Sequence, residues 1–260
     1  MQMILVVDVG NTTIRFGLFY GDEIIVMWKI MTKIQKTSDE YTVIINSWFT
    51  QHNIDKTGVK GVVISSVVPN VMHSFNNAIR KTFGLEPLIV KAGIKTGISI
   101  NVDDPREVGP DRIVDAAAAY NLYGGPSVVL DFGTATTYDL INEKGAFISA
   151  VTSPGIQISA DALGTRTAML PNIEIVKPPT ILAKNTISSM QAGLVYGYVG
   201  QVEYIVKRIK KEANYPNATV VATGGYAQVI QEETDVIDIY DPLLTLKGMK
   251  IIWDKNNYAK

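Results

Sequence analysis

The chain has 260 residues, of which 47% are hydrophobic and 19% charged, a composition typical of globular proteins and too apolar for disorder. Its net charge of −1 gives no general attraction to nucleic acid or to anionic membranes, so we expect neither as a partner. The absence of cysteine excludes disulfides, thiolate zinc sites and a cysteine nucleophile. The sequence shows neither a signal-peptide pattern nor an apolar run of about 20 residues, so we expect a cytoplasmic protein.

Strand and helix patterns alternate through the first half of the chain. In chain order they predict strands at 3–7, 13–19 and 24–30, a helix at 40–52, a strand at 59–68, a helix at 71–83, a strand at 87–90 and a helix at 111–120. Gly10-Asn11 between the first two strands favours a hairpin. The segment Thr37-Ser38-Asp39 is suited to cap the first helix, and Gly84 follows the second.

The second half repeats part of the first. Its patterns predict strands at 127–130, 136–142 and 146–151, helices at 156–163 and 188–213, and a strand at 219–222. In both halves an apolar strand is followed by Asp, any residue, Gly and a polar residue, once around Asp8 and once around Asp131. A single repeat about half a chain length apart indicates two related α/β lobes, which we place at residues 1–117 and 118–260, with a cleft expected between them.

The first turn, Asp8-Val9-Gly10-Asn11-Thr12, has the residue types that cradle phosphates. Gly10 allows close approach of the backbone and permits a positive φ, while Asn11, Thr12 and Thr13 add neutral donors. Asp8 beside phosphates suits a bridging Mg²⁺, which takes oxygen ligands. The alternative is a plain hairpin in which Asp8 accepts hydrogen bonds from the turn.

The second turn, Asp131-Phe132-Gly133-Thr134, is followed closely by further threonines. Their hydroxyls and amides suit a phosphate or a cation, although Thr136 and Thr137 also have high β propensity.

A different pair of residues, Asp111 and Arg112, opens the helix predicted at 111–120. Asp111 is an N-terminal acid favoured by the helix dipole, yet with Arg112 it also forms a pair able to accept a hydroxyl proton and bind an anion.

An ordered series of motifs along nearly the whole chain resembles the type III pantothenate kinases, the first enzymes of coenzyme A synthesis. The motifs are Asp8–Thr12, Ser65–Pro69, Gly109–Arg112, Asp131–Thr137, Ser153–Ile156, Ala168–Pro171, Lys184–Thr186, Thr223–Gly225 and Asp241–Gly248. The resemblance implies an actin-like ATPase fold with two ribonuclease-H-like lobes, mixed β-sheets and flanking helices. It also implies ATP as phosphoryl donor, with Mg²⁺, and pantothenate as acceptor.

The resemblance also implies roles for individual residues. Asp111 would be the general base, and Asp131 would bind a monovalent cation, K⁺ or NH₄⁺. Thr186 would reach pantothenate from the partner subunit of a homodimer. Contacts to ATP would come from Asp8, Val9, Gly10, Asn11, Thr12, Thr13, Ile14, Arg15 and Thr134. Contacts to pantothenate would come from Val102, Gly109, Pro110, Asp111, Arg112 and Thr186.

Two positions depart from the family pattern. Ser149-Ala150 stands where the family has a glycine pair, and Val102 stands where it often has tyrosine. Two other functions are compatible with the residues: a ligand-binding accessory factor for transcription without catalysis, and a kinase of another small hydroxyl substrate. The motif Gly109–Arg112 favours the pantothenate kinases over sugar kinases, and the intact acidic residues favour a catalyst.

Overall fold

The computed structural model describes residues 2–32, 36–91 and 93–257, which form two compact units. Unit 1 comprises the described residues of Met1–Gly97, Asp104–Ala118 and Thr245–Lys260, and unit 2 comprises Ile98–Asp103 and Ala119–Leu244. The lobes predicted as 1–117 and 118–260 stay a prediction, and the units differ from them in placing the C-terminal segment in unit 1 and Ile98–Asp103 in unit 2. Within the described residues, no helix is both long and apolar enough to cross a membrane.

Unit 1 is built on a five-stranded mixed sheet. The strand order is β3-β2-β1-β4-β5, with β1, β2 and β3 antiparallel and β1, β4 and β5 parallel. The strands are β1 Met3–Val9, β2 Thr13–Tyr20, β3 Glu23–Met31, β4 Val59–Ser66 and β5 Leu88–Ile89. The helices of this part of the chain are α1 Ser38–Gln51, α2 Pro69–Phe83, α3 Pro110–Tyr123, which continues into unit 2, α7 Leu244–Asn257, and the short 3-10 helices Lys56–Gly58 and Pro105–Glu107.

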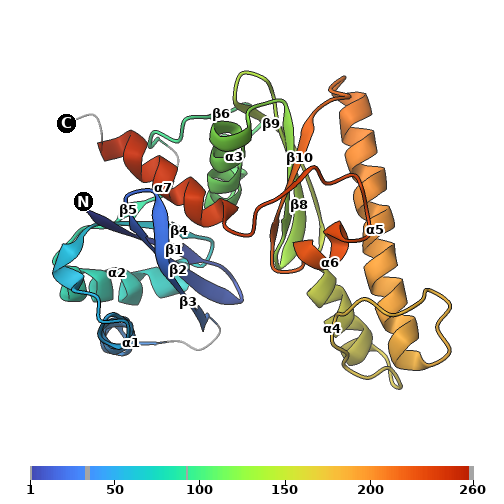
Figure 1. The fold of residues 1–260 in the computed structure, drawn as a ribbon, viewed down its shortest axis with the longest axis horizontal. Coiled ribbons are helices and arrows are strands. Elements are labelled where there is room, and N and C mark those ends of the chain that lie inside the picture. The colour runs from blue at the N-terminus through green and yellow to red at the C-terminus, as the bar shows by residue number, and fades with distance from the viewer. Residues whose placement is uncertain (1, 33–35, 92, 258–260) are drawn as a thin grey trace. The chain divides into compact units, whose positions relative to one another are not determined.

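One face of this sheet packs on α1 and α2, which lie beside each other in Figure 1. Alternate residues of β2, Ile14, Phe16 and Leu18, point into this core. The ring of Phe16 lies 5.8 Å from that of Phe75 in α2. The other face receives α7, because Leu246 packs against Gly17 of β2. The two-sided burial explains why β1 is apolar at nearly every position.

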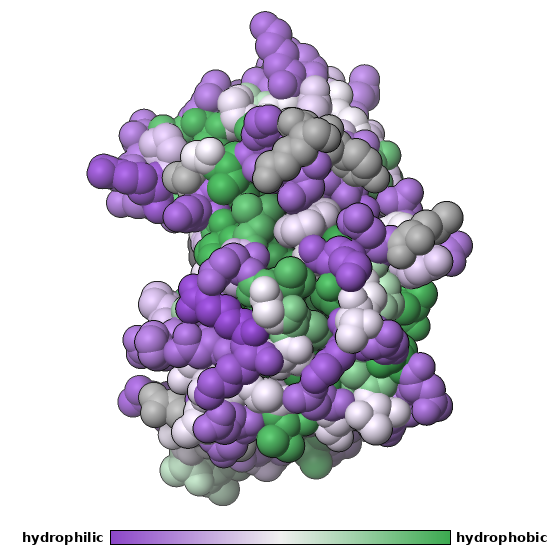
Figure 2. Space-filling view, turned by 90° about the vertical axis from the view of Figure 1, so that its left-hand side faces the viewer, coloured by the Kyte–Doolittle hydropathy of each residue, from purple (hydrophilic) through white to green (hydrophobic). Residues whose placement is uncertain are grey.

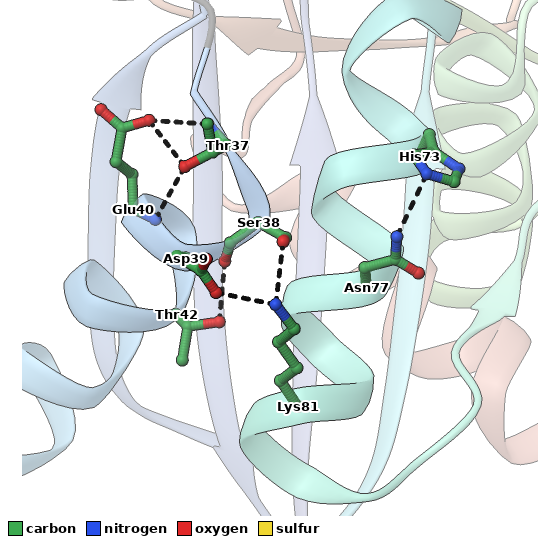
Figure 3. A network of polar contacts seen from close by, with 8 residues as sticks. All are labelled: Thr37, Ser38, Asp39, Glu40, Thr42, His73, Asn77 and Lys81. Atoms are coloured by element: carbon green, nitrogen blue, oxygen red, sulfur yellow. Dashed lines mark hydrogen bonds and ion pairs between the residues drawn. The ribbon is translucent and has the colours of Figure 1, made fainter.

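Polar contacts fix the start of α1 and tie it to α2 (Figure 3). Thr37 and Glu40 form a reciprocal capping box, which identifies Thr37 as the cap within the predicted segment Thr37-Ser38-Asp39. Lys81 of α2 donates to Ser38 at 3.1 Å and to Asp39 at 2.7 Å. Because these side chains are exposed, they contribute more to the orientation of the two helices than to stability.

Unit 2 contains a six-stranded sheet with the order β11-β10-β7-β8-β9-β6. The strands are β6 Ser99–Ile100, β7 Ser127–Phe132, β8 Ala135–Ile141, β9 Ala146–Pro154, β10 Thr219–Gly224 and β11 Ile239–Tyr240. The helices are α4 Ile156–Arg166, α5 Thr186–Glu212 and α6 Ala227–Gln231. Side chains of α5, among them Leu194, Val195 and Val202, share the core of this unit with Val128 and Leu130 of β7.

The repeat expected from the sequence is confirmed as a repeated topology. In unit 1 the hairpin β1–β2 continues antiparallel into β3, while β1 pairs in parallel with β4. In unit 2 the hairpin β7–β8 continues antiparallel into β9, while β7 pairs in parallel with β10. Asp8 and Asp131 therefore occupy equivalent positions, each near the end of the strand that is central to this shared pattern.

The surface mixes hydrophilic residues with smaller hydrophobic patches (Figure 2). In unit 1 the outward positions of the edge strand β3 carry Ile25, Met27 and Met31, each about half exposed. In unit 2 several exposed aliphatic side chains belong to the segment before α5 and to its first turn: Met169 at 91%, Leu182 at 77%, Ile181 at 61% and Ile187 at 51%.

Candidate active site

The first turn is a three-residue connection, Gly10-Asn11-Thr12, between β1 and β2. The amide of Gly10 donates to the carbonyl of Thr13 at 3.0 Å, and a Cβ at Gly10 would lie 3.2 Å from that same carbonyl. The described glycines with positive φ do not include Gly10, so this glycine is needed for close packing and not for a left-handed backbone. Thr32 closes the turn, since its hydroxyl donates to the Gly10 carbonyl at 2.7 Å and its amide to the Thr12 carbonyl at 2.9 Å.

Asp8 is buried in this turn and forms an ion pair with Arg15. The two residues are cross-strand neighbours in the β1–β2 hairpin. Nε and Nη2 of Arg15 donate to the same carboxylate oxygen, Oδ2, at 3.0 and 2.8 Å, and Nη2 also donates to the hydroxyl of Thr245 at 3.3 Å. Thr245 belongs to α7 and is 2% exposed, so the C-terminal helix contacts the arginine that pairs with Asp8.

Asp111 is the second residue of helix α3. It lies in unit 1, which also contains the β1–β2 turn. Its Oδ1 accepts a hydrogen bond from the backbone amide of Arg112 at 2.9 Å. A Cβ at Gly109 would collide with this carboxylate oxygen, so the glycine leaves the space that Asp111 occupies. Burial raises the pKa of Asp111, and the neighbouring Asp8 carboxylate raises it further, against the lowering effect of the Arg112 amide.

The second turn is one residue shorter than the first, since only Gly133 and Thr134 connect β7 and β8. Two other glycines, Gly155 and Gly224, lie in close contact with the second turn. A Cβ at Gly224, whose φ is +96°, would lie 2.5 Å from Oδ1 of Asp131 and 2.5 Å from the amide nitrogen of Phe132. A Cβ at Gly155 would collide with the carbonyl oxygens of Gly133 and Thr134. The ends of β9 and β10 thus hold the second turn in place without side chains.

The donor set at the two turns suits hard cations, which prefer oxygen ligands. Asp8 accepts two hydrogen bonds from Arg15 on Oδ2, and its carboxylate is the oxygen ligand of this turn that suits a hydrated Mg²⁺. Beside Asp131, the buried hydroxyls of Thr136 and Thr223 have no hydrogen-bond partner among the described residues. No group of three or more His, Asp or Glu able to hold a metal occurs in the described part of the chain. The residues therefore fit cations that keep waters or phosphates as further ligands, and not a metal enclosed by protein alone.

The remaining predicted site residues lie in different parts of the fold. Gly109–Arg112 begin α3 in unit 1, whereas Val102 is half-buried beside β6 in unit 2. Thr186 is the exposed first residue of α5, directly after the N-cap Asn185. Within unit 1 the structure thus brings Asp8 and Asp111 together, and within unit 2 it brings the second turn to Gly155 and Gly224.

Neither of the two prominent cavities in the described residues includes a predicted site residue. One, of about 700 Å³, lies at the C-terminal end of α5 and is lined by Val206, Lys207, Lys210, Pro216 and Val236 among others. The other, of about 390 Å³, is lined by Ile4, Lys250 and Trp253 among others. The lysines of the first cavity stand near a helix C-terminus, where the helix dipole favours cations, so they need no ligand to explain them.

Sequence reasoning missed two residues that shape the site: Thr32, which contacts the first turn, and Tyr198 of α5, which donates a hydrogen bond to the carbonyl of Pro154, next to Gly155. Thr245 lies in the motif Asp241–Gly248, but its contact with Arg15 was not expected. No local sequence pattern indicates such contacts. Gly155 and Gly224 did carry a signal, since both stand at strand ends within motifs that the sequence singled out.

Comparisons with known proteins agree with this geometry. The model of the type III pantothenate kinase family matches residues 4–208. A type III pantothenate kinase of Agathobacter rectalis is 52% identical over 255 residues, which is 98% of each chain. Among solved structures, a Campylobacter jejuni protein described as a Baf family transcriptional activator aligns with a TM-score of 0.60 at 19% identity, covering 98% of this chain and 99% of the other. The ethanolamine utilization protein EutJ of Carboxydothermus hydrogenoformans aligns with a TM-score of 0.55 at 15% identity, covering 97% and 90%.

The repeated mixed sheets and these structural neighbours define an α/β protein of the actin-like ATPase and sugar kinase fold, with two ribonuclease-H-like lobes. The chain belongs to the type III pantothenate kinase family. Its reaction is the ATP-dependent phosphorylation of pantothenate in coenzyme A synthesis.

Proposed function

We propose that this kinase acts in the cytoplasm as a homodimer, in which the first and second turns hold ATP and Asp111 activates the acceptor hydroxyl. The observation that carries the proposal is the setting of Asp111. It is a partly buried carboxylate with a raised pKa, held by the Arg112 amide in the same unit as the first turn. A carboxylate whose pKa moves toward the working pH is a stronger proton acceptor.

Phosphoryl transfer depends mainly on positioning and on neutralising charge. The γ-phosphoryl group moves from ATP to the primary hydroxyl of pantothenate, the proton of that hydroxyl passes to Asp111, and ADP leaves. Arg112 orients the acceptor together with Gly109, Pro110 and Val102. The backbone of Gly10–Thr13 contacts the phosphates, and Arg15 keeps Asp8 in its orientation.

Two cations complete the proposed site. Mg²⁺ would be held by Asp8 through water or directly, and K⁺ or NH₄⁺ by Asp131. When bound they would neutralise charge on the phosphates. Thr134 contacts ATP from the exposed tip of the second turn. The buried hydroxyls of Thr136 and Thr223 near Asp131 support the monovalent cation, and the carboxylate oxygens of Asp8 are the hard ligands that Mg²⁺ prefers.

The exposed face of α5 supports a homodimer. Gly193, Gly197 and Gly200 recur on one side of the helix, and an added Cβ at any of them would meet nothing within 4 Å. The exposed apolar residues Leu182 and Ile187 lie at the N-terminal end of the same helix. Exposed apolar side chains beside an open helix face fit the close approach of a second copy. Thr186, at that end, would reach pantothenate bound to the partner.

A coupled assay tests the function. ADP release should depend on pantothenate, and activity should fall when K⁺ is replaced by Na⁺ at constant ionic strength. ADP release that another small alcohol stimulates and pantothenate does not would instead favour a kinase of another hydroxyl substrate. Ligand binding with no turnover of any hydroxyl substrate would favour the non-catalytic accessory factor.

The contribution of Thr186 across the dimer is testable by complementation. The Asp111→Asn and Thr186→Val homodimers should both be impaired. In a purified heterodimer of the two variants, one site combines an intact Asp111 with an intact partner Thr186, so it should recover about half of wild-type activity, as two-fold symmetry requires.

The heterodimer is obtained by co-expression with two different affinity tags, and the wild-type chain carrying both tags serves as control. If Thr186 acts within its own chain, every site of the heterodimer lacks one of the two residues. A heterodimer as inactive as its parents would therefore contradict the contribution across the interface.

A further inference from the structure

The last residues of β9 connect the long helix α5 with the second turn. Ser153 and Pro154 end the strand, and Gly155 caps α4, which follows. On one side, this segment contacts Tyr198 and Gln201, which lie nearly one turn apart on α5. On the other side it packs against Thr134. All of these residues belong to unit 2.

Tyr198 supplies the principal contact from α5. It is 8% exposed, and its hydroxyl lies 2.7 Å from the Pro154 carbonyl and 2.7 Å from the Ser159 hydroxyl. A carbonyl oxygen only accepts, so the single proton of Tyr198 is donated to Pro154, and Ser159 is the donor to the tyrosine oxygen. Next to it, the Ser153 hydroxyl lies 3.2 Å from Oε1 of Gln201 and 3.3 Å from the Thr136 carbonyl.

The residue after Pro154 transmits this contact to the second turn. The amide of Gly155 donates to the Thr134 carbonyl at 3.1 Å. A Cβ at Gly155 would collide with the same carbonyl, so the two backbones are in direct contact with no side chain between them. A displacement of the Pro154–Gly155 peptide therefore displaces Thr134, because closely packed backbone has no free volume to absorb it.

We propose that Tyr198 is a positioning residue for the second turn: through the Pro154 carbonyl and the Gly155 amide it fixes the carbonyl of Thr134 and the orientation of the turn toward ATP and its monovalent cation. This inference rests on the proposed role of the second turn in binding both. Tyr198 itself touches neither ligand. It holds the residues that contact the ligands, and the loss of such a residue weakens ligand binding without any direct contact to the ligand.

The test is Tyr198→Phe, which removes the donor and keeps the ring in the core. We expect the KM for ATP and the K⁺ concentration for half-maximal activity to rise by about tenfold, the range found for outer supports of metal sites. The KM for pantothenate should stay within about twofold, because the acceptor is bound by other residues. Binding of ATP alone, followed by the ligand-induced rise in unfolding temperature at fixed K⁺, should weaken in parallel.

Ser159→Ala is the matched control. It removes a hydroxyl at the same 2.7 Å distance from Tyr198 but leaves the bond from Tyr198 to Pro154 in place. We expect ATP and K⁺ dependence close to wild type in this variant, even where its unfolding temperature falls. Equal effects of both substitutions, or a lower unfolding temperature in Tyr198→Phe with unchanged ATP and K⁺ dependence, would overturn the proposal. If the wild-type protein bound ATP in a K⁺-dependent way but showed no pantothenate-dependent turnover, that result would count against the proposed function. The ATP-binding assay would still compare Tyr198→Phe with Ser159→Ala and so test the role of Tyr198.

Discussion

Replacing Asp111 with Asn is expected to lower turnover by about 10²- to 10⁴-fold, the usual contribution of a general base. The substitution keeps the shape of the side chain. The Oδ1 of Asn still accepts the hydrogen bond that the Arg112 amide gives to Asp111 at 2.9 Å, so the start of α3 should not change. What is lost is the ability to take the hydroxyl proton of pantothenate. Steady-state kinetics with saturating ATP measure the effect, and near-normal turnover would rule out Asp111 as the base.

The same variant should be more stable than the wild type at neutral pH. Burial and the nearby Asp8 raise the pKa of Asp111, so the folded state holds this proton more tightly than the unfolded state does. Stability is then greatest below the pKa of the unfolded carboxyl and falls as the pH rises through the raised folded value. Asn bears no charge and avoids this loss. Thermal unfolding across pH should therefore show a gain for the variant at neutral pH that disappears in acid.

Asp104→Asn provides the contrast within the same segment. The hydrogen bonds from Arg106 lower the pKa of Asp104, so its charged form is favoured in the folded state. This substitution should leave turnover within about twofold of wild type and should not stabilise the protein at neutral pH. The pH dependence of kcat/KM adds a second check on Asp111. The acidic limb of the wild-type profile should be retained in Asp104→Asn and absent from the residual activity of Asp111→Asn.

Gly224→Ala is expected to damage the second turn severely. A residue with φ +96° is strained when it carries a side chain, and here the added Cβ would also lie 2.5 Å from both Oδ1 of Asp131 and the Phe132 amide nitrogen. Strain and overpacking together should lower the free energy of unfolding by about 2–4 kcal/mol. Displacement of the Asp131 carboxylate should also raise the K⁺ concentration for half-maximal activity by about tenfold.

The neighbouring Gly225 separates these effects from the mere addition of a methyl group. An ideal Cβ at Gly225 meets nothing within 4 Å, so Gly225→Ala should leave the denaturant midpoint of unfolding close to wild type. Urea unfolding of the two variants, followed by circular dichroism, measures the difference in stability. Equal midpoints for the two alanine variants would show that the second turn does not depend on the space left by Gly224.

Much of the fold could be predicted from periodicity and turn residues. The hairpins around Asp8 and Asp131 and the long helix α5 were all expected within a few residues of their observed bounds. The two-residue strands β6, β5 and β11 are too short to show a pattern, and only β5 was expected. The helix α7 was missed because Gly248 interrupts it. That glycine is required by packing, since a Cβ there would collide with the Val114 carbonyl of α3.

For the candidate site, too, some residues could be predicted from the sequence and others could not. Asp8, Asp111 and Asp131 stand at strand ends and a helix start, where sequence patterns locate them. The contact of Arg15 with Thr245 joins residues 230 positions apart, and Tyr198 reaches Pro154 across 44 positions. Such supports depend on tertiary packing, which local propensity does not encode. The sequence therefore indicated the residues proposed to contact the substrates better than the residues that hold them in place.

The return of α7 to unit 1 has a consequence for synthesis on the ribosome. Trp253 of α7 covers Gly61 of β4, and Leu246 covers Gly17 of β2, so the N-terminal sheet lacks this packing until the last residues of the chain have been made. Unit 1 is translated first but completed last, whereas domains in general fold as units in the order of their synthesis. A chain that ends before residue 244 lacks Leu246 and Trp253, so this face of the N-terminal sheet stays without their cover.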